Sequence, residues 1–228
     1  MKFFLLFIVF FTAPIIAQNN SKSLYKAFDK VVGLKNTDLS YGSLYYEKYR
    51  TLEDNHPFFN TSNFVLGNVT YQNQEFFDVL IKYDIAEDHL ILNLSSTFEN
   101  RSIILEKPFV TGFSIANKSF INIKEYGFCE ILKKTSSIEL LKKNVKEKKK
   151  KLNTSYVYYK FLENNFYLLK YNDTYHKINN KKDFYTLFPK NKNTITTFYK
   201  VNKNLRKNNL DQFYALLVTE ISTNLTNK

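Results

Sequence analysis

Three histidines and one cysteine are the side chains here that most often do chemistry, and none of them stands in a known motif. His56, His89 and His176 are far apart in the chain, and no second ligand type lies near them at metal-site spacing. Zinc sites place their ligands at short, regular intervals. Cys129 lies in an apolar run typical of a strand, which predicts a buried, unreactive thiol. We therefore expect neither a zinc site nor a cysteine nucleophile.

Carboxylates gather at one turn, where Asp84, Glu87 and Asp88 lie within five residues. Calcium prefers oxygen ligands, but its twelve-residue loop places them at fixed positions around a required glycine. This turn has neither that spacing nor the glycine. The interpretation we favour over a calcium site is an exposed acidic hairpin turn.

Other catalytic patterns are missing as well. A hydrolase serine usually stands in a glycine-rich elbow, and neither Gly42-Ser43 nor Gly112-Phe113-Ser114 forms one. The chain has only 5 glycines, and none belongs to a phosphate-cradling loop. We predict no catalytic, metal-binding or cofactor-binding residue, and no cofactor.

Seven lysines crowd into one stretch, partly offset by Glu147, within a chain of formal net charge +12. At this density like charges repel, which favours a solvated, mobile hairpin tip. The alternative is a contact with a polyanion. The candidate contact residues are Lys142, Lys143, Lys146, Lys148, Lys149, Lys150 and Lys151.

The start of the chain has the order of a secretory signal. Lys2 supplies a positive charge, residues 3–11 are an unbroken apolar run, and Ala17 is a small residue at a suitable cleavage point. An uncleaved anchor needs about 20 apolar residues, and Pro14 interrupts this run earlier. No cysteine near the cleavage point could carry a lipid. We expect residues 1–17 to be removed and the protein to be periplasmic or secreted.

The remaining chain is long enough for one large domain or one domain with a small appendage. Cys129 is the only cysteine, so no intramolecular disulfide can form. Apolar residues make up 44% of the sequence and aromatic residues 17%, which is far from the composition of disordered chains. Packing must therefore provide the stability.

Strand patterns dominate the middle of the chain. Residues 64–71 and 76–83 are β-rich runs separated by a polar turn, which predicts a hairpin, and residues 89–94 add a third strand. Further short runs continue this meander; they cover residues 41–49, 102–105, 109–115, 119–124, 128–132, 156–161, 166–171 and 175–178. Residues 138–152 are ambiguous between a strand, a helix and a hairpin tip.

Helical periodicity marks both ends of the mature chain. Residues 23–34 predict a short amphipathic helix. Residues 181–187 predict a helix that ends before Pro189, and the spacing from Ile195 to Leu205 suits a second. A third begins near Asn209, a good N-cap, and runs to Ile221. An apolar stripe must cover another surface, so we expect this helical end to pack on the sheet.

Several short segments combine glycine, aromatic and charged residues in a distinctive order. They are Tyr41-Gly42-Ser43-Leu44-Tyr45-Tyr46, His56-Pro57-Phe58-Phe59, Gly67-Asn68-Val69-Thr70-Tyr71, Lys82-Tyr83-Asp84-Ile85, and Lys181-Lys182-Asp183 with Leu187-Phe188-Pro189. With the signal ending Ile15-Ile16-Ala17-Gln18, they resemble small exported proteins of Bacteroidetes, especially flavobacteria. The resemblance covers most of the mature chain. It implies export and brings no catalytic or binding residue with it.

These patterns predict an α+β protein. We expect a signal peptide at 1–17, an N-terminal helix with an antiparallel β-meander at 18–178, and a helical segment at 179–228 packed on the sheet. The strands of the meander should be antiparallel, because its turns are too short for parallel crossovers. We expect the meander to curl into a half-barrel or a sandwich.

Three functional hypotheses follow. The first is an exported, non-enzymatic binding or envelope-associated protein that holds an apolar ligand or another envelope protein. The second is an envelope-acting enzyme, which requires carboxylates, tyrosines or histidine to converge in one pocket. The third is attachment to a polyanion through the lysine-rich stretch. We expect contact with a membrane surface at most, no membrane span after signal removal, and no nucleic-acid partner.

Overall fold

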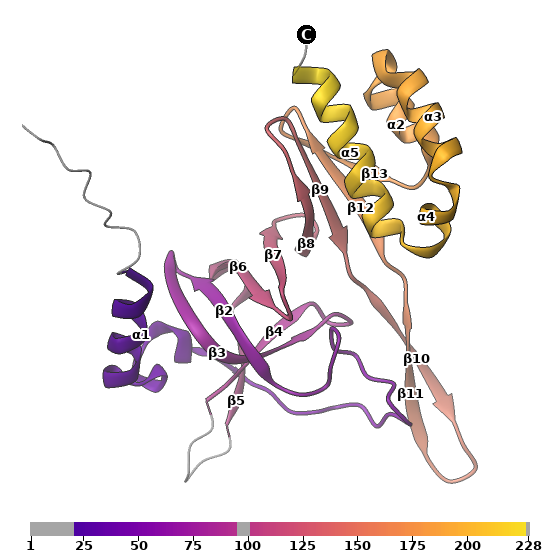
Figure 1. Cartoon of the computed structure of the whole chain (residues 1–228). Coiled ribbons are helices and arrows are strands. Elements are labelled where there is room, and N and C mark those ends of the chain that lie inside the picture. Colours follow the sequence, from indigo (N-terminus) through magenta and orange to yellow (C-terminus); the bar gives the residue numbers. More distant parts are fainter. Residues whose placement is uncertain (1–20, 95–100, 227–228) are drawn as a thin grey trace, which may run out of the picture.

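A large antiparallel sheet with helices at its two ends is the architecture of this protein (Figure 1). The computed structural model describes residues 21–94 and 101–226. The predicted signal peptide at 1–17 lies outside these residues. Within the described ranges, no helix is long and apolar enough to cross a membrane.

Eleven strands form the main sheet in the order β1-β5-β4-β3-β2-β6-β7-β8-β9-β12-β13, and every pairing is antiparallel. Between β9 and β12, the chain extends into a separate two-stranded ribbon, β10 and β11. The strands are β1 (Gly42–Leu44), β2 (Val65–Tyr71), β3 (Gln74–Asp84), β4 (His89–Asn93), β5 (Ser102–Leu105), β6 (Val110–Ile115), β7 (Lys118–Ile123), β8 (Gly127–Lys134), β9 (Ile138–Lys143), β10 (Lys146–Leu152), β11 (Val157–Glu163), β12 (Phe166–Tyr171) and β13 (Thr174–Ile178).

The helices are α1 (Ser21–Val32), α2 (Lys181–Leu187), α3 (Lys192–Val201), α4 (Lys203–Asn208) and α5 (Leu210–Thr226). Single 3-10 turns cover Leu34–Asn36, Asp38–Ser40, Lys107–Phe109 and Pro189–Asn191. The predicted α+β class, the antiparallel meander, the short N-terminal helix and the helical C-terminal end are confirmed. The sheet remains open and does not close into a barrel.

Two predicted boundaries were wrong, and one ambiguous stretch is resolved. The strand expected over 41–49 ends at Leu44. The helix expected between Ile195 and Leu205 is divided into α3 and α4 at Asn202. The ambiguous stretch 138–152 forms two strands, β9 and β10, because Ile138, Leu140 and Leu141 are buried in the sheet and β10 pairs with β11.

Tight turns explain why neighbouring strands pair. The β2–β3, β6–β7 and β12–β13 hairpins each turn through two residues with positive φ: Gln72 and Asn73, Ala116 and Asn117, and Asn172 and Asp173. Two-residue turns with both φ values positive match the right-handed twist of antiparallel strands. Asparagine and aspartate adopt this conformation more readily than most residues.

The sheet carries two hydrophobic cores on one face. The first core lies inside the curve of β2 to β8, where the Phe113 and Phe120 rings stack at 4.7 Å and Tyr83 and Phe128 meet them edge-on. The second core lies between the strands β8, β9, β12 and β13 and the helices α2, α3 and α5, with Phe184 and Phe213 fully buried. The aromatic residues of the middle strands thus fill much of the first core.

Local capping fixes the helical end against the sheet. The Asn180 side chain accepts a hydrogen bond from the Lys182 amide at the start of α2, and the Asp183 side chain accepts one from the Asn180 amide. This capping box satisfies amides that the first helical turn cannot pair. Leu217 and Ile221 of α5 are then buried in the second core.

Helix α1 packs against the opposite part of the sheet, on β3. Tyr25 contacts Phe77, and Lys26 forms an ion pair with Asp78. Leu24, Phe28 and Val31 point away from this contact and are largely exposed. The predicted amphipathic helix is therefore present, with part of its apolar side uncovered.

Candidate ligand-binding site

The turn between β3 and β4 is built by its own carboxylates. Asp84 Oδ1 accepts hydrogen bonds from the amides of Ala86 at 2.9 Å and Glu87 at 3.0 Å, which closes the turn. Asp88 follows with a φ of 58°. We expected an exposed acidic turn, and this was wrong for two of its three carboxylates. Asp84 is 4% exposed and the Asp88 side chain 18%, because both point back into the protein.

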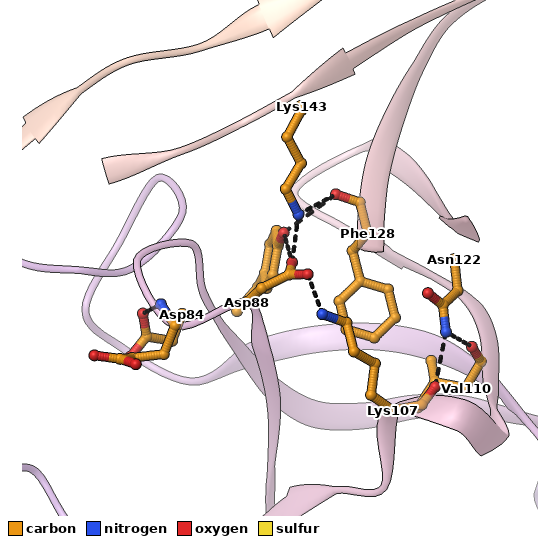
Figure 2. Close-up of polar contacts among 9 residues, drawn as sticks. Asp84, Asp88, Lys107, Val110, Asn122, Phe128 and Lys143 are labelled. Carbon is orange, nitrogen blue, oxygen red and sulfur yellow. Dashed lines mark hydrogen bonds and ion pairs between the residues drawn. The ribbon is translucent and has the colours of Figure 1, made fainter. Parts of the chain in front are cut away.

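Asp88 collects three donors, and two of them are lysines from distant parts of the chain, as Figure 2 shows. Lys143 Nζ lies 2.6 Å from Asp88 Oδ1, and the Tyr83 hydroxyl donates to the same oxygen at 2.6 Å. Lys107 Nζ forms an ion pair with the other oxygen, Oδ2. We call Tyr83, Asp88, Lys107 and Lys143 the Asp88 centre. It places two ammonium groups on one carboxylate.

The electrostatics of the centre follow from burial and charge. Burial disfavours the charge of Asp88, but the Lys143 charge and the hydrogen bonds from Lys107, Lys143 and Tyr83 outweigh it and hold the carboxyl pKa below its ordinary value. Burial lowers the pKa of Lys143 despite the neighbouring carboxylate. Burial also raises the pKa of Tyr83 well above its ordinary value, so this hydroxyl remains a donor.

A cleft with a volume of about 800 Å³ opens beside the centre. Asp88 and Lys107 line it, Pro108 and Tyr126 supply apolar surface, Thr111, Asn122 and Lys124 supply polar groups, and Glu125 adds a second carboxylate. We call it the Asp88 cleft. Volumes of about 300–1,000 Å³ with apolar walls and a few placed polar groups are usual for ligand sites.

One side chain, Asn122, and one glycine, Gly127, position the segments that line the Asp88 cleft. Asn122 Nδ2 donates to the carbonyl oxygens of Lys107 at 2.7 Å and Val110 at 2.9 Å, which fixes the segment that carries Lys107 (Figure 2). Gly127 has a φ of 71°, and a Cβ at this position would overlap Asp88 Oδ2 and lie 2.9 Å from Lys107 Nζ. The glycine therefore lets the β7–β8 turn approach the ion pairs closely.

The structure divides the seven lysines of the predicted polyanion contact. Lys142 pairs with Asp211 at 2.8 Å, Lys143 belongs to the Asp88 centre, and Lys146 donates to two carbonyl oxygens. Lys148 pairs with Glu87 at 2.9 Å. The expectation that all seven share one solvated tip was wrong, because the stretch begins inside the sheet and reaches solvent only along β10.

The other three lysines, Lys149, Lys150 and Lys151, are exposed and have no side-chain partner within the described ranges. They lie on the ribbon of β10 and β11, which extends away from helices α2 to α5 (Figure 1). Lys160 of β11 stands directly opposite Lys149. Four lysines thus share the outer part of the ribbon.

Cys129 is buried and His56 is partly buried. Cys129 is fully buried, as predicted, and burial raises its thiol pKa to about 11. His56 accepts a hydrogen bond from the Phe58 amide at 3.2 Å, and burial lowers its pKa. Among the described residues, no three His, Cys, Asp or Glu side chains are grouped to hold a metal ion.

Sequence reasoning missed Tyr83 and Lys107 as site residues. Lys107 lies 19 positions from Asp88 and Lys143 lies 55 positions from it, and only the curled sheet brings them together. The one sequence signal was the close group of carboxylates at the β3–β4 turn, which marked the place but not the partners.

We compared the chain with protein-family models, curated proteins and solved structures, and none of them matches it.

Proposed function

We propose that this chain is an exported, non-enzymatic binding protein of the cell envelope whose Asp88 cleft takes a small organic anion. The observation that supports this most is the charge of the Asp88 centre. Two ammonium groups, from Lys107 and Lys143, share a single carboxylate at the edge of the cleft. One positive charge is left without a full partner, and an anion would compensate it.

The residues that line the Asp88 cleft indicate which class of ligand it would bind. A carboxylate or phosphate group would meet the Lys107 ammonium, whose side chain is 38% exposed and accessible from the cleft. The apolar part of the ligand would lie against Pro108 and Tyr126. The filled aromatic core makes this chemistry a better choice than a purely apolar ligand.

A titration followed by amide NMR tests this proposal. We expect phenyl phosphate and benzoate to cause saturable shifts at the amides of Asn122, Lys124 and Gly127, and neutral benzamide to cause none. Lys107→Gln should weaken binding by about tenfold, the equivalent of 1.4 kcal/mol. Lys190→Gln, at an exposed position far from the cleft, is the matched control. Equal responses to benzoate and benzamide, or equal affinity of Lys107→Gln and the control, would contradict the proposal.

A second candidate function is attachment to a polyanion through the outer ribbon. Lys149 and Lys160 are directly opposite each other in the β10–β11 pairing. Like charges at such positions repel, and an anionic partner would relieve this repulsion. The same ribbon carries Lys150 and Lys151, so the charge is concentrated over a few residues.

We expect the triple variant Lys149→Gln, Lys150→Gln, Lys151→Gln to lose most of the retention of the protein on a heparin column. The variant Lys200→Gln, Lys203→Gln, Lys207→Gln removes the same charge from the exposed faces of α3 and α4 and should lose less. Retention of the wild type should fall as the salt concentration rises. Equal losses in the two triple variants would show that net charge and not the ribbon determines retention.

A further inference from the structure

A belt of charged side chains separates the two hydrophobic cores on the inner face of the sheet. Strand β8 shows the change along its length, because Phe128 belongs to the first core, Glu130 lies in the belt, and Leu132 packs against the second core. On the neighbouring strand, Lys142 stands directly opposite Glu130. A cavity of about 360 Å³ lies over this belt. We call it the charged cleft.

Two ion pairs form the floor of the charged cleft. Glu130 is 2% exposed; its Oε1 lies 2.8 Å from Lys118 Nζ, and its Oε2 accepts from Asn144 Nδ2 at 2.9 Å. Lys142 Nζ lies 2.8 Å from Asp211 Oδ2 at the start of α5. A buried charge is costly unless it is paired, and the two most buried of these groups, Glu130 and Lys142, each have a partner of opposite charge.

Two further charges on the wall are not paired in this way. Lys146 Nζ donates to the carbonyl oxygens of His56 at 2.7 Å and Phe58 at 3.0 Å, and within the described ranges no carboxylate lies within 4.0 Å of it. An ammonium group has three donors, so one is left for a ligand. Glu163, opposite Lys146 in the β10–β11 pairing, accepts from Asn165 Nδ2 at 3.3 Å. Its charge acts on Lys146 through space, but among the described side chains no ammonium group lies within 4.0 Å of its carboxylate.

We propose that the charged cleft binds a small zwitterion, the size of an amino acid or dipeptide, with its carboxylate on Lys146 and its ammonium group on Glu163. The two side chains lie on one wall of the cavity and carry opposite charges, so a ligand with both charges complements them. A volume of about 360 Å³ suits a ligand of this size. This site is separate from the Asp88 cleft and does not depend on the function proposed for it.

Three probes of similar shape test both charges of the ligand. Alanylalanine carries an ammonium group and a carboxylate, N-acetylalanine only the carboxylate, and alaninamide only the ammonium group. In amide NMR titrations we expect alanylalanine to cause saturable shifts at Asn144, Val145 and Asn165. The two singly charged probes should bind at least about tenfold more weakly, because each leaves one wall charge without a partner.

Two variants distinguish the site from a general effect of charge. Glu163→Gln keeps the shape of the wall and should abolish the preference for alanylalanine over N-acetylalanine. Lys146→Met should abolish the preference over alaninamide, and an unchanged spectrum elsewhere would show that the variant is folded. Lys107→Gln, in the other cleft, should leave alanylalanine binding unchanged, so the two proposals fail independently. Absence of saturable shifts up to millimolar alanylalanine, or equal binding of the three probes, would overturn the inference.

Discussion

Asp88 joins polar side chains from several parts of the chain in the first half of the sheet. Its carboxylate receives Lys143, Lys107 and the Tyr83 hydroxyl, which come from β9, from the turn before β6, and from β3. Lys143 also donates to the Phe128 carbonyl oxygen at 3.1 Å. One side chain therefore links three parts of the chain that no short sequence pattern connects.

Replacement of Asp88 should destabilise the fold strongly. Asp88→Asn removes the only anion of the centre and leaves Lys143, whose side chain is 9% exposed, without a counter-charge. Breaking a buried ion pair in this way costs about 3–5 kcal/mol. Urea unfolding should show that loss, and adding Lys143→Met should restore part of it because the unpaired charge is removed as well. The control is Asp173→Asn, at a side chain that is 96% exposed, which should be near neutral.

The effect of Asp88 should also depend on pH in a defined direction. Its pKa lies below the ordinary value, so the ionised form stabilises the fold above the unfolded pKa of about 3.9. That stabilisation is lost as the pH falls through the lower pKa of the folded state. The difference in unfolding free energy between wild type and Asp88→Asn should thus be largest near neutral pH and shrink below about pH 4. A difference that grew with falling pH would contradict this account.

At the scale of elements, short turns determine which strands meet and where the side chains of the candidate site lie. The hairpin turns at 72–73, 116–117 and 172–173 keep consecutive strands adjacent, as the sequence predicted for the first of them. The β7–β8 turn does more than connect two strands. Its Gly127 allows Asp88 and Lys107 to approach the backbone.

Two glycines with a similar positive φ allow the cost of backbone strain to be distinguished from the cost of a steric clash. Gly33 has a φ of 77° and open space around it, whereas Gly127 has a φ of 71° and lies against Asp88. Gly33→Ala should cost about 1–3 kcal/mol, because a residue with a Cβ rarely adopts a φ of 77° together with a ψ of 133°. Gly127→Ala should cost clearly more in urea unfolding, because the new methyl group displaces the Asp88 carboxylate. Equal losses for the two variants would mean that the contact with Asp88 is unimportant.

At the scale of the whole molecule, periodicity predicted the fold but not the site. The two-residue alternation of residues 64–94 and the helical spacing around Phe213 and Leu217 describe burial against a neighbour, which is a local property of the sequence. The pairing of β2 with β6 and of β1 with β5 joins distant segments, and no local pattern specifies it. The Asp88 centre and the charged cleft likewise join residues that are far apart in the chain, so these residues looked like ordinary surface charges in the sequence.

Export remains a prediction of the sequence and has a direct test. Expression in a bacterium with an intact secretion system should yield a protein that starts at Gln18, because Ala17 is the expected last residue of the signal. Intact-mass spectrometry of the periplasmic and medium fractions measures this. Recovery of the form that still begins with Met1, in the cytoplasm, would refute it.

The open sheet has a consequence for association between chains. A sheet that does not close must leave two outer strands whose backbone groups can pair with another molecule and start aggregation. Here these positions are occupied by β1, of three residues, and β13, of five residues. The long, strongly apolar strands lie inside the order, each with a neighbour on both sides. Within the described residues, the eleven-stranded sheet thus offers only short outer strands to a second chain, and the longer free edges are those of the β10–β11 ribbon.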